Sequence, residues 1–139
     1  RTESEQSFEK NCARIRQVAR PGSLVYLITD AVHLTDEAVR HLAHVTRHCE
    51  LIVCLISDPL ELQLPESKQR ITVSISDGEQ QKQWVLGDKS LAEKYQQTAH
   101  ILHKSTEQKL TKAGARLLHF SASEPLETQL RKGVASWIR

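Results

Sequence analysis

Residues 51–58, with the sequence LIVCLISD, decide the fold. Six apolar residues run without interruption into Ser57 and Asp58, and no polar residue alternates with them. This pattern is typical of a strand buried on both faces, as in a parallel sheet covered by helices. Residues 23–30, SLVYLITD, have the same character. Both segments are therefore predicted to be strands buried on both faces.

The segment between these two runs has helical spacing. Thr35, followed by Asp36 and Glu37, indicates a helix start. One stripe of this helix carries its apolar residues, namely Ala38, Leu42, Val45 and Cys49. A strand, a helix and a second strand at this distance predict a right-handed crossover unit, so the fold class is α/β with a parallel sheet.

Further helices and one more strand are expected on either side of this unit. A helix is predicted over residues 7–18, ended by Pro21 and Gly22. A second, long helix is predicted to start at a capping box of Ser90 and Glu93 and to end at Gly114. The inward stripe of the long helix is predicted to be Leu91, Tyr95, Thr98, Leu102, Thr106 and Leu110. Residues 116–120 should form the last strand. Residues 124–138 should form a closing helix with Leu126, Leu130, Val134 and Trp137 at core spacing.

The stretch after Asp58 departs from the crossover rhythm. Pro59 breaks the strand and Pro65 continues an irregular segment, after which residues 70–75 alternate between apolar and polar. The pair Asp77-Gly78 is a strong signal for a tight hairpin turn, and residues 83–86 can return from it. An antiparallel hairpin is therefore predicted over residues 71–86.

The bulk composition limits the classes of function. The 139 residues are enough for one domain, and a net charge of +2 from 19 basic and 17 acidic residues gives no preference for nucleic acid. Three cysteines form no disulfide or zinc pattern, so we expect reduced thiols, with Cys49 and Cys54 buried. No apolar run approaches a membrane span, and the N-terminus has no signal-peptide pattern. We therefore expect a soluble, cytoplasmic segment.

Two aspartates and three histidines are the candidate site residues. Asp30 and Asp58 end predicted strands, where α/β sheets place ligands, although Asp30 can also be a polar cap and Asp58 a turn initiator. The helical histidines His41, His44 and His48 have spacing that zinc could use, but we interpret them as solvent-facing. The sequence has no G-x-S-x-G turn, Walker loop or G-x-G-x-x-G turn. We therefore predict no catalytic and no cofactor-binding residue, and no enzyme.

Several strings of the sequence carry a likeness to a known family, namely residues 21–30, 40–42, 47–48, 58–61 and 64–65, with residues 76–78 and 125–126 further on. They resemble the bacterial domain of unknown function 58 family, which is von Willebrand factor A-like. The resemblance implies a three-layer, Rossmann-like von Willebrand factor A-like sheet with an inserted β-hairpin. In such domains a divalent cation is held by a D-x-S-x-S loop, a threonine and a later aspartate, and Asp30 matches that aspartate.

The resemblance also implies which part of the domain is present. No D-x-S-x-S occurs in the sequence, so residues 1–139 are expected to be the C-terminal part of a single von Willebrand factor A-like domain. Asp30 would then bind magnesium only in the intact domain, and this fragment would carry no cofactor, since one carboxylate binds magnesium weakly. We also expect a homodimer through the edge of the strand at residues 24–29, where the domain's first strand would pair.

The function implied by the resemblance is protein interaction. Members of this family are commonly encoded beside MoxR-type AAA+ ATPases, so the expected partner is such an ATPase or its client, with attachment to a membrane only through upstream sequence. An alternative is a standalone regulatory or small-ligand-binding α/β domain. A receiver domain, one form of that alternative, needs a lysine after its last strand, which residues 120–122 do not supply.

Overall fold

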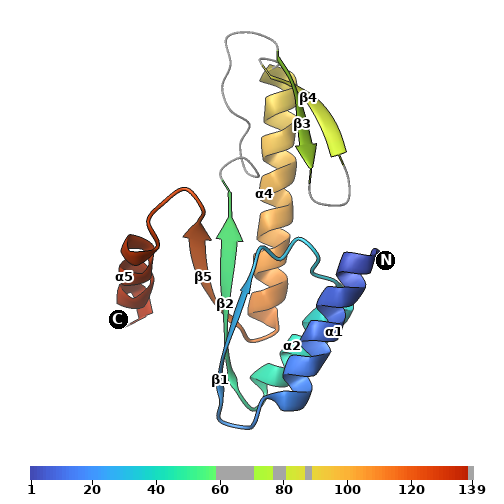
Figure 1. Ribbon diagram of the computed structural model, residues 1–139. Helices are drawn as coiled ribbons and strands as arrows, with labels where there is room; N and C mark the ends of the chain where they lie inside the picture. The colour runs from blue at the N-terminus through green and yellow to red at the C-terminus, as the bar shows by residue number, and fades with distance from the viewer. Residues whose placement is uncertain (59–70, 77–80, 87–88, 138–139) are drawn as a thin grey trace. The chain divides into compact units, whose positions relative to one another are not determined.

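A computed structural model describes residues 1–58, 71–76, 81–86 and 89–137 of the chain. The chain divides into two compact units, one made of Arg1–Ser57 with Lys104–Arg139 and one made of Asp58–His103. The first unit contains α1 (Glu3–Val18), β1 (Leu24–Thr29), α2 (Asp36–Thr46), β2 (Glu50–Ser57), the end of α4 (Lys89–Lys112), β5 (Arg116–Ser121) and α5 (Leu126–Trp137). Figure 1 shows these elements along the chain.

The first unit is built on a sheet of three parallel strands in the order β1-β2-β5. The central strand, β2, pairs in parallel with both of its neighbours. Helices α1 and α2 lie on one side of the sheet and α5 lies on the other (Figure 1). This confirms the predicted α/β class, with a Rossmann-like parallel sheet flanked by helices.

β2 is buried on both faces, as predicted. Successive side chains of a strand point to opposite sides of the sheet, so β2 contributes to two cores. The larger core lies on the side of α1 and α2 and contains Cys12, Ala31, Ala38, Leu42, Leu51, Val53, Leu55, Leu110 and Ala115. The smaller core, on the opposite face, contains Ile52, Cys54, Leu118 and Phe120.

The prediction for β1 is wrong for one of its two faces. Val25 and Leu27 pack against the larger core, but the alternate residues Leu24, Tyr26 and Ile28 are 52%, 57% and 70% exposed. β1 is an edge strand, and no described residue covers this second row. The apolar run in the sequence therefore continues onto an open surface.

Helix α1 begins before the predicted residue 7, because a capping box lies upstream. The Thr2 side chain accepts from the backbone N–H of Glu5, and the Glu5 carboxylate accepts from the backbone N–H of Thr2, both at the first turn. This reciprocal pair satisfies two backbone donors that a helix start leaves open. Further along, Cys12 is fully buried and Phe8 packs on the core.

Helix α2 begins where the sequence predicts it. Thr35 is its N-cap residue and its hydroxyl accepts from the backbone N–H of Ala38 at 3.2 Å. The same hydroxyl donates to the carboxylate of Glu9 at 2.7 Å, and Arg1 donates to the other oxygen of that carboxylate at 2.8 Å. Glu9 is only 8% exposed, so this pair of partners satisfies a buried charge and ties α1 to the start of α2.

A tight connection joins α4 to β5 at Gly114, the residue predicted to end the helix. The N–H of Ala115 bonds to the carbonyl of Leu110, and the N–H of Gly114 bonds to the carbonyl of Thr111. With Gly114 at φ +95°, this is a Schellman motif, and its two apolar members, Leu110 and Ala115, both belong to the larger core. The turn therefore fixes how the end of α4 lies against β5.

The predicted stripes of α4 and α5 are only partly correct. Leu110 is buried, but Leu102, in the second unit, is 63% exposed. In α5, Leu126 and Leu130 are 60% and 42% exposed while Gln129 is buried. Ser90 is not an N-cap residue, because α4 already includes Lys89.

Gln129 is buried because its side chain binds the backbone at the end of β5. Its amide oxygen accepts from the N–H of Ser121, and its amide nitrogen donates to the carbonyl oxygens of Ser121 at 3.0 Å and Glu124 at 2.9 Å. These bonds replace the apolar contact that helical spacing had predicted for this helix start.

The second unit contains the predicted antiparallel hairpin. β3 (Ile71–Ser76) pairs with β4 (Gln81–Leu86) in register from Ile71↔Leu86 to Ser76↔Gln81. The start of α4 completes the described part of this unit. The predicted turn at Asp77-Gly78, the irregular segment at residues 59–65 and the predicted last helical residue, 138, lie outside the described residues.

Gly114 and Gly22 offer a matched pair of substitutions that tests the α4–β5 connection. Both have positive φ, +95° and +85°, but a Cβ at Gly114 would lie 2.8 Å from the Thr46 hydroxyl, whereas one at Gly22 meets nothing within 4 Å. Gly22→Ala should cost about 1 to 2 kcal/mol from the left-handed backbone alone. Gly114→Ala should cost roughly a further 1 to 3 kcal/mol from crowding, measured as the free energy of unfolding in urea. Equal losses in the two variants would show that the contact with Thr46 does not constrain the turn.

Candidate functional site

Asp30 lies at the carboxyl end of β1, as the sequence predicts. Its side chain is exposed, and one carboxylate oxygen accepts from the backbone N–H of Val32 at 3.1 Å. The preceding Thr29 hydroxyl accepts from the N–H of Ala31, which is buried and has φ +59°. These bonds hold the loop after β1 in a sharp turn. The carboxylate retains a second oxygen that could bind a cation.

The structure does not collect further metal ligands around Asp30 within the described residues. Within these residues, three His, Cys, Asp or Glu side chains with converging ligand atoms occur elsewhere, in a group that does not include Asp30. Asp58 also follows its strand and is exposed. Position at a strand end thus brings two acidic residues to the same edge of the sheet, without building a three-ligand site there.

The histidines of α2 differ in their surroundings. His48 is exposed, as predicted, but the side chain of His41 is only 19% exposed, so the interpretation of all three as solvent-facing is wrong for His41. His41 pairs with Glu37 at 3.6 Å, one turn earlier on the helix. Desolvation, followed by the nearby charges of Arg16 and Arg47, lowers the pKa of His44. These histidines do not belong to the group of converging ligands found in the described residues.

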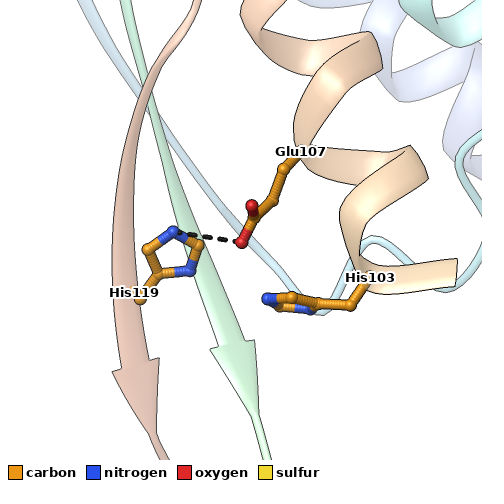
Figure 2. Close-up of side chains that lie close together, drawn as sticks. All are labelled: His103, Glu107 and His119. Atoms are coloured by element: carbon orange, nitrogen blue, oxygen red, sulfur yellow. Dashed lines mark ion pairs between the residues drawn. The ribbon is translucent and has the colours of Figure 1, made fainter. Parts of the chain in front are cut away.

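That group consists of His103, Glu107 and His119, which the sequence analysis missed. One ligand atom from each side chain lies within 4.8 Å of the others. Figure 2 shows His103 and Glu107 on α4 and His119 on β5, with the three side chains converging. His119 Nε2 lies 3.4 Å from Glu107 Oε1, and the two side chains are 50% and 33% exposed. The group is thus within reach of solvent.

The order of the elements explains this convergence. α4 enters the Gly114 turn and β5 leaves it, so moving back along the helix corresponds to moving forward along the strand. Three helical residues rise about 4.5 Å and two strand residues about 6.6 Å. Leu110 and Leu117 both pack in the larger core, and Glu107 and His119 are displaced from them in the same direction by these similar distances.

His103 joins the group through the helix itself. The boundary between the two compact units falls between His103 and Lys104, inside α4, whose helical residues are continuous from Lys89 to Lys112. Residues four apart on a helix lie on the same face, one above the other. The position of His103 next to Glu107, on the same face of α4, thus follows from helix geometry alone. Their spacing, H-x-x-x-E, was the one signal that the sequence contained.

The comparisons with known proteins add no relative. No protein-family model, curated protein or solved structure matches the chain. The likeness to the von Willebrand factor A-like family therefore depends on the short strings of the sequence alone. Among the helices described, none combines the length and the apolar content needed to cross a bilayer.

Two of the three thiols are unsuited to metal binding or nucleophilic chemistry. All three are free, as expected, but the buried ones are Cys12 and Cys54, whereas Cys49 is half-buried and its Sγ donates to the carbonyl of Arg20. The prediction that Cys49 is buried is therefore wrong. Burial, aided by the carboxylate of Glu9, raises the pKa of Cys12 to about 11, and burial raises the pKa of Cys54. Both thiols are therefore protonated at neutral pH.

This difference between the thiols predicts their reactivity. In the folded protein at pH 8, a disulfide reagent such as Ellman's reagent should modify Cys49 rapidly, and Cys12 and Cys54 only as fast as the chain unfolds, because the thiolate is the reactive form. Absorbance should rise in one fast phase that Cys49→Ser removes. A fast phase that survives in Cys49→Ser would contradict the burial of the other two thiols.

The pKa of His44 predicts a pH dependence of stability. An imidazole whose pKa is lower in the folded state than in the unfolded state binds its proton more strongly after unfolding. The contribution of His44 to the free energy of unfolding should thus be complete above pH 6.5 and should fall as the pH decreases from there through the lowered pKa. Nuclear magnetic resonance titration should show an upward shift of this pKa in Arg16→Gln and no shift in Arg14→Gln. An unchanged pKa in Arg16→Gln would rule out that charge as a cause.

Proposed function

We propose that this chain is a non-enzymatic protein-interaction module that binds its partner along β1. The observation that carries the proposal is the row formed by Leu24, Tyr26 and Ile28, with exposed fractions of 52%, 57% and 70%. Single exposed apolar residues are ordinary on protein surfaces, whereas a contiguous row marks an interaction site more often.

The position of the row favours a protein partner. Its side chains alternate along β1 and project from one face at steps of about 7 Å. β1 is also an edge of the sheet, so an added strand can bond to its backbone while covering the apolar row. A small molecule would use only part of such a flat surface, since small ligands bind in concave pockets.

The resemblance supplies the proposed context. A von Willebrand factor A-like domain of the domain of unknown function 58 family would act in the bacterial cytoplasm with a MoxR-type AAA+ ATPase or its client. In the intact domain the first strand would pair with the edge of β1, so the partner would bind the apolar row, and Asp30 would bind magnesium together with the D-x-S-x-S loop. Asp30 immediately follows β1, so this one metal ligand and the apolar row would lie on one continuous segment.

A second copy of the chain is a partner that can be tested directly. Two β1 edges can pair antiparallel around a two-fold axis and cover both apolar rows. Lysine in the row disfavours such pairing, because the charge would lose water at the interface. The substitution should be made at Ile28 and not at Val25, since Val25 packs on the larger core.

The experiment is sedimentation of the purified chain, alone and mixed with the MoxR-type ATPase from the same genome. We expect self-association or ATPase binding that Ile28→Lys weakens at least tenfold, about 1.4 kcal/mol. Val18→Lys is the control, because Val18 is 67% exposed at the end of α1, outside the row. A chain that neither self-associates nor binds the ATPase, or that does so equally well as Ile28→Lys, would contradict the proposal.

A further inference from the structure

We propose that His103, Glu107 and His119 form a zinc-binding site that holds α4 against β5. The site is independent of the proposed interaction along β1 and of Asp30, because it uses other elements of the chain. Two imidazoles and one carboxylate are a ligand set that zinc takes in proteins when a fourth position is left for water or a bound group.

The distances between the ligand atoms suit a tetrahedral ion. Ligands at about 2.0 to 2.1 Å from zinc at tetrahedral angles lie roughly 3.3 Å from one another. His119 Nε2 and Glu107 Oε1 are 3.4 Å apart, and the whole set lies within 4.8 Å. The remaining ligand atom, on His103, lies within 4.8 Å of the other two.

The backbone positions behind two of the ligands are fixed by the fold. His119 lies on β5, where it is the register partner of Leu55 on the buried central strand. Glu107 lies one turn before Leu110, which is 1% exposed in the larger core. The Schellman turn and the bond from the Thr46 hydroxyl to the carbonyl of Ala113 hold the end of α4. Such a site is largely formed before the metal arrives.

The charge and exposure of the group favour capture of a cation from solvent. Glu107 pairs with His119 in the structure, and a partly exposed pair of this kind is worth little. The imidazole nitrogens favour zinc over magnesium and calcium, which prefer oxygen ligands. The open coordination position would face solvent, because His119 is half exposed.

The test is a calorimetric titration of the metal-free chain, produced without a histidine tag, with zinc chloride at pH 7.5. We expect one zinc ion per chain with a dissociation constant of about 1 μM or below. Cobalt chloride should give the visible absorption bands of four-coordinate cobalt. Zinc should also raise the melting temperature, because it binds the folded state preferentially.

Single-residue variants assign the ligands. His103→Ala, Glu107→Gln and His119→Ala should each weaken zinc binding by at least roughly tenfold. The loss of a residue that only hydrogen-bonds to a metal ligand already reduces metal affinity by roughly tenfold or more, so the loss of a ligand should do at least as much. His100→Ala, on the same helix, and Asp30→Asn are the matched controls and should bind as the parent does. Circular dichroism of each variant checks that the fold is retained. If a variant unfolds, the zinc-induced shifts of the His103 and His119 ring resonances in the parent protein assign the ligands instead.

Several outcomes would overturn the proposal. These are the absence of zinc binding, cobalt spectra of an octahedral ion, or binding that the three ligand variants leave unchanged. Zinc binding that His100→Ala weakens as strongly as His119→Ala would show adventitious binding by surface histidines.

Discussion

The first unit depends on the burial of β2 on both of its faces. Residues 51–55 are at most 7% exposed, and each such side chain contributes about 1.5 to 3 kcal/mol when it leaves water. This burial requires a layer of helices on one side, a neighbouring strand at each edge and an apolar cover on the other side. The positions of α1, α2, β1 and β5 all follow from these requirements, and each strand end that carries a candidate ligand is placed by its register with β2.

The sequence was sufficient to predict the elements and the parallel pairing, but not which surfaces are covered. Residues 23–30 and 51–58 have the same apolar pattern, yet only the second is buried on both faces, because coverage depends on neighbours in space. Helical spacing likewise predicted Leu126 and Leu130 as core residues of α5. The buried residue is instead Gln129, whose amide bonds to the end of β5. Such a polar contact depends on the tertiary position of both partners, which a periodic pattern does not contain.

The candidate sites differ in how far the sequence could reveal them. Asp30 was predicted from its place after a strand, and its position was correct, although its metal ligation remains a prediction. The pair His103 and Glu107 was visible as H-x-x-x-E, a spacing that is common on exposed helices. His119 could not be added to it, because the alignment of α4 with β5 is set by the Gly114 turn and by Leu110 in the core. The side chains that lie near His119 can be identified only when the geometry of this turn is known.

The pairing of β2 with β5 has a consequence for how the chain folds. β1, α2 and β2 follow one another directly, whereas β2 ends at Ser57 and β5 begins at Arg116, so residues 58–115 separate two paired strands. Closing so long a segment costs entropy, but only about 0.6 kcal/mol more for each doubling of its length. Because its contacts are local, we expect the crossover of β1, α2 and β2 to form first and β5 to join it later. The rate of folding should thus be set by this distant pairing, while the length of the intervening segment has little effect on the final stability.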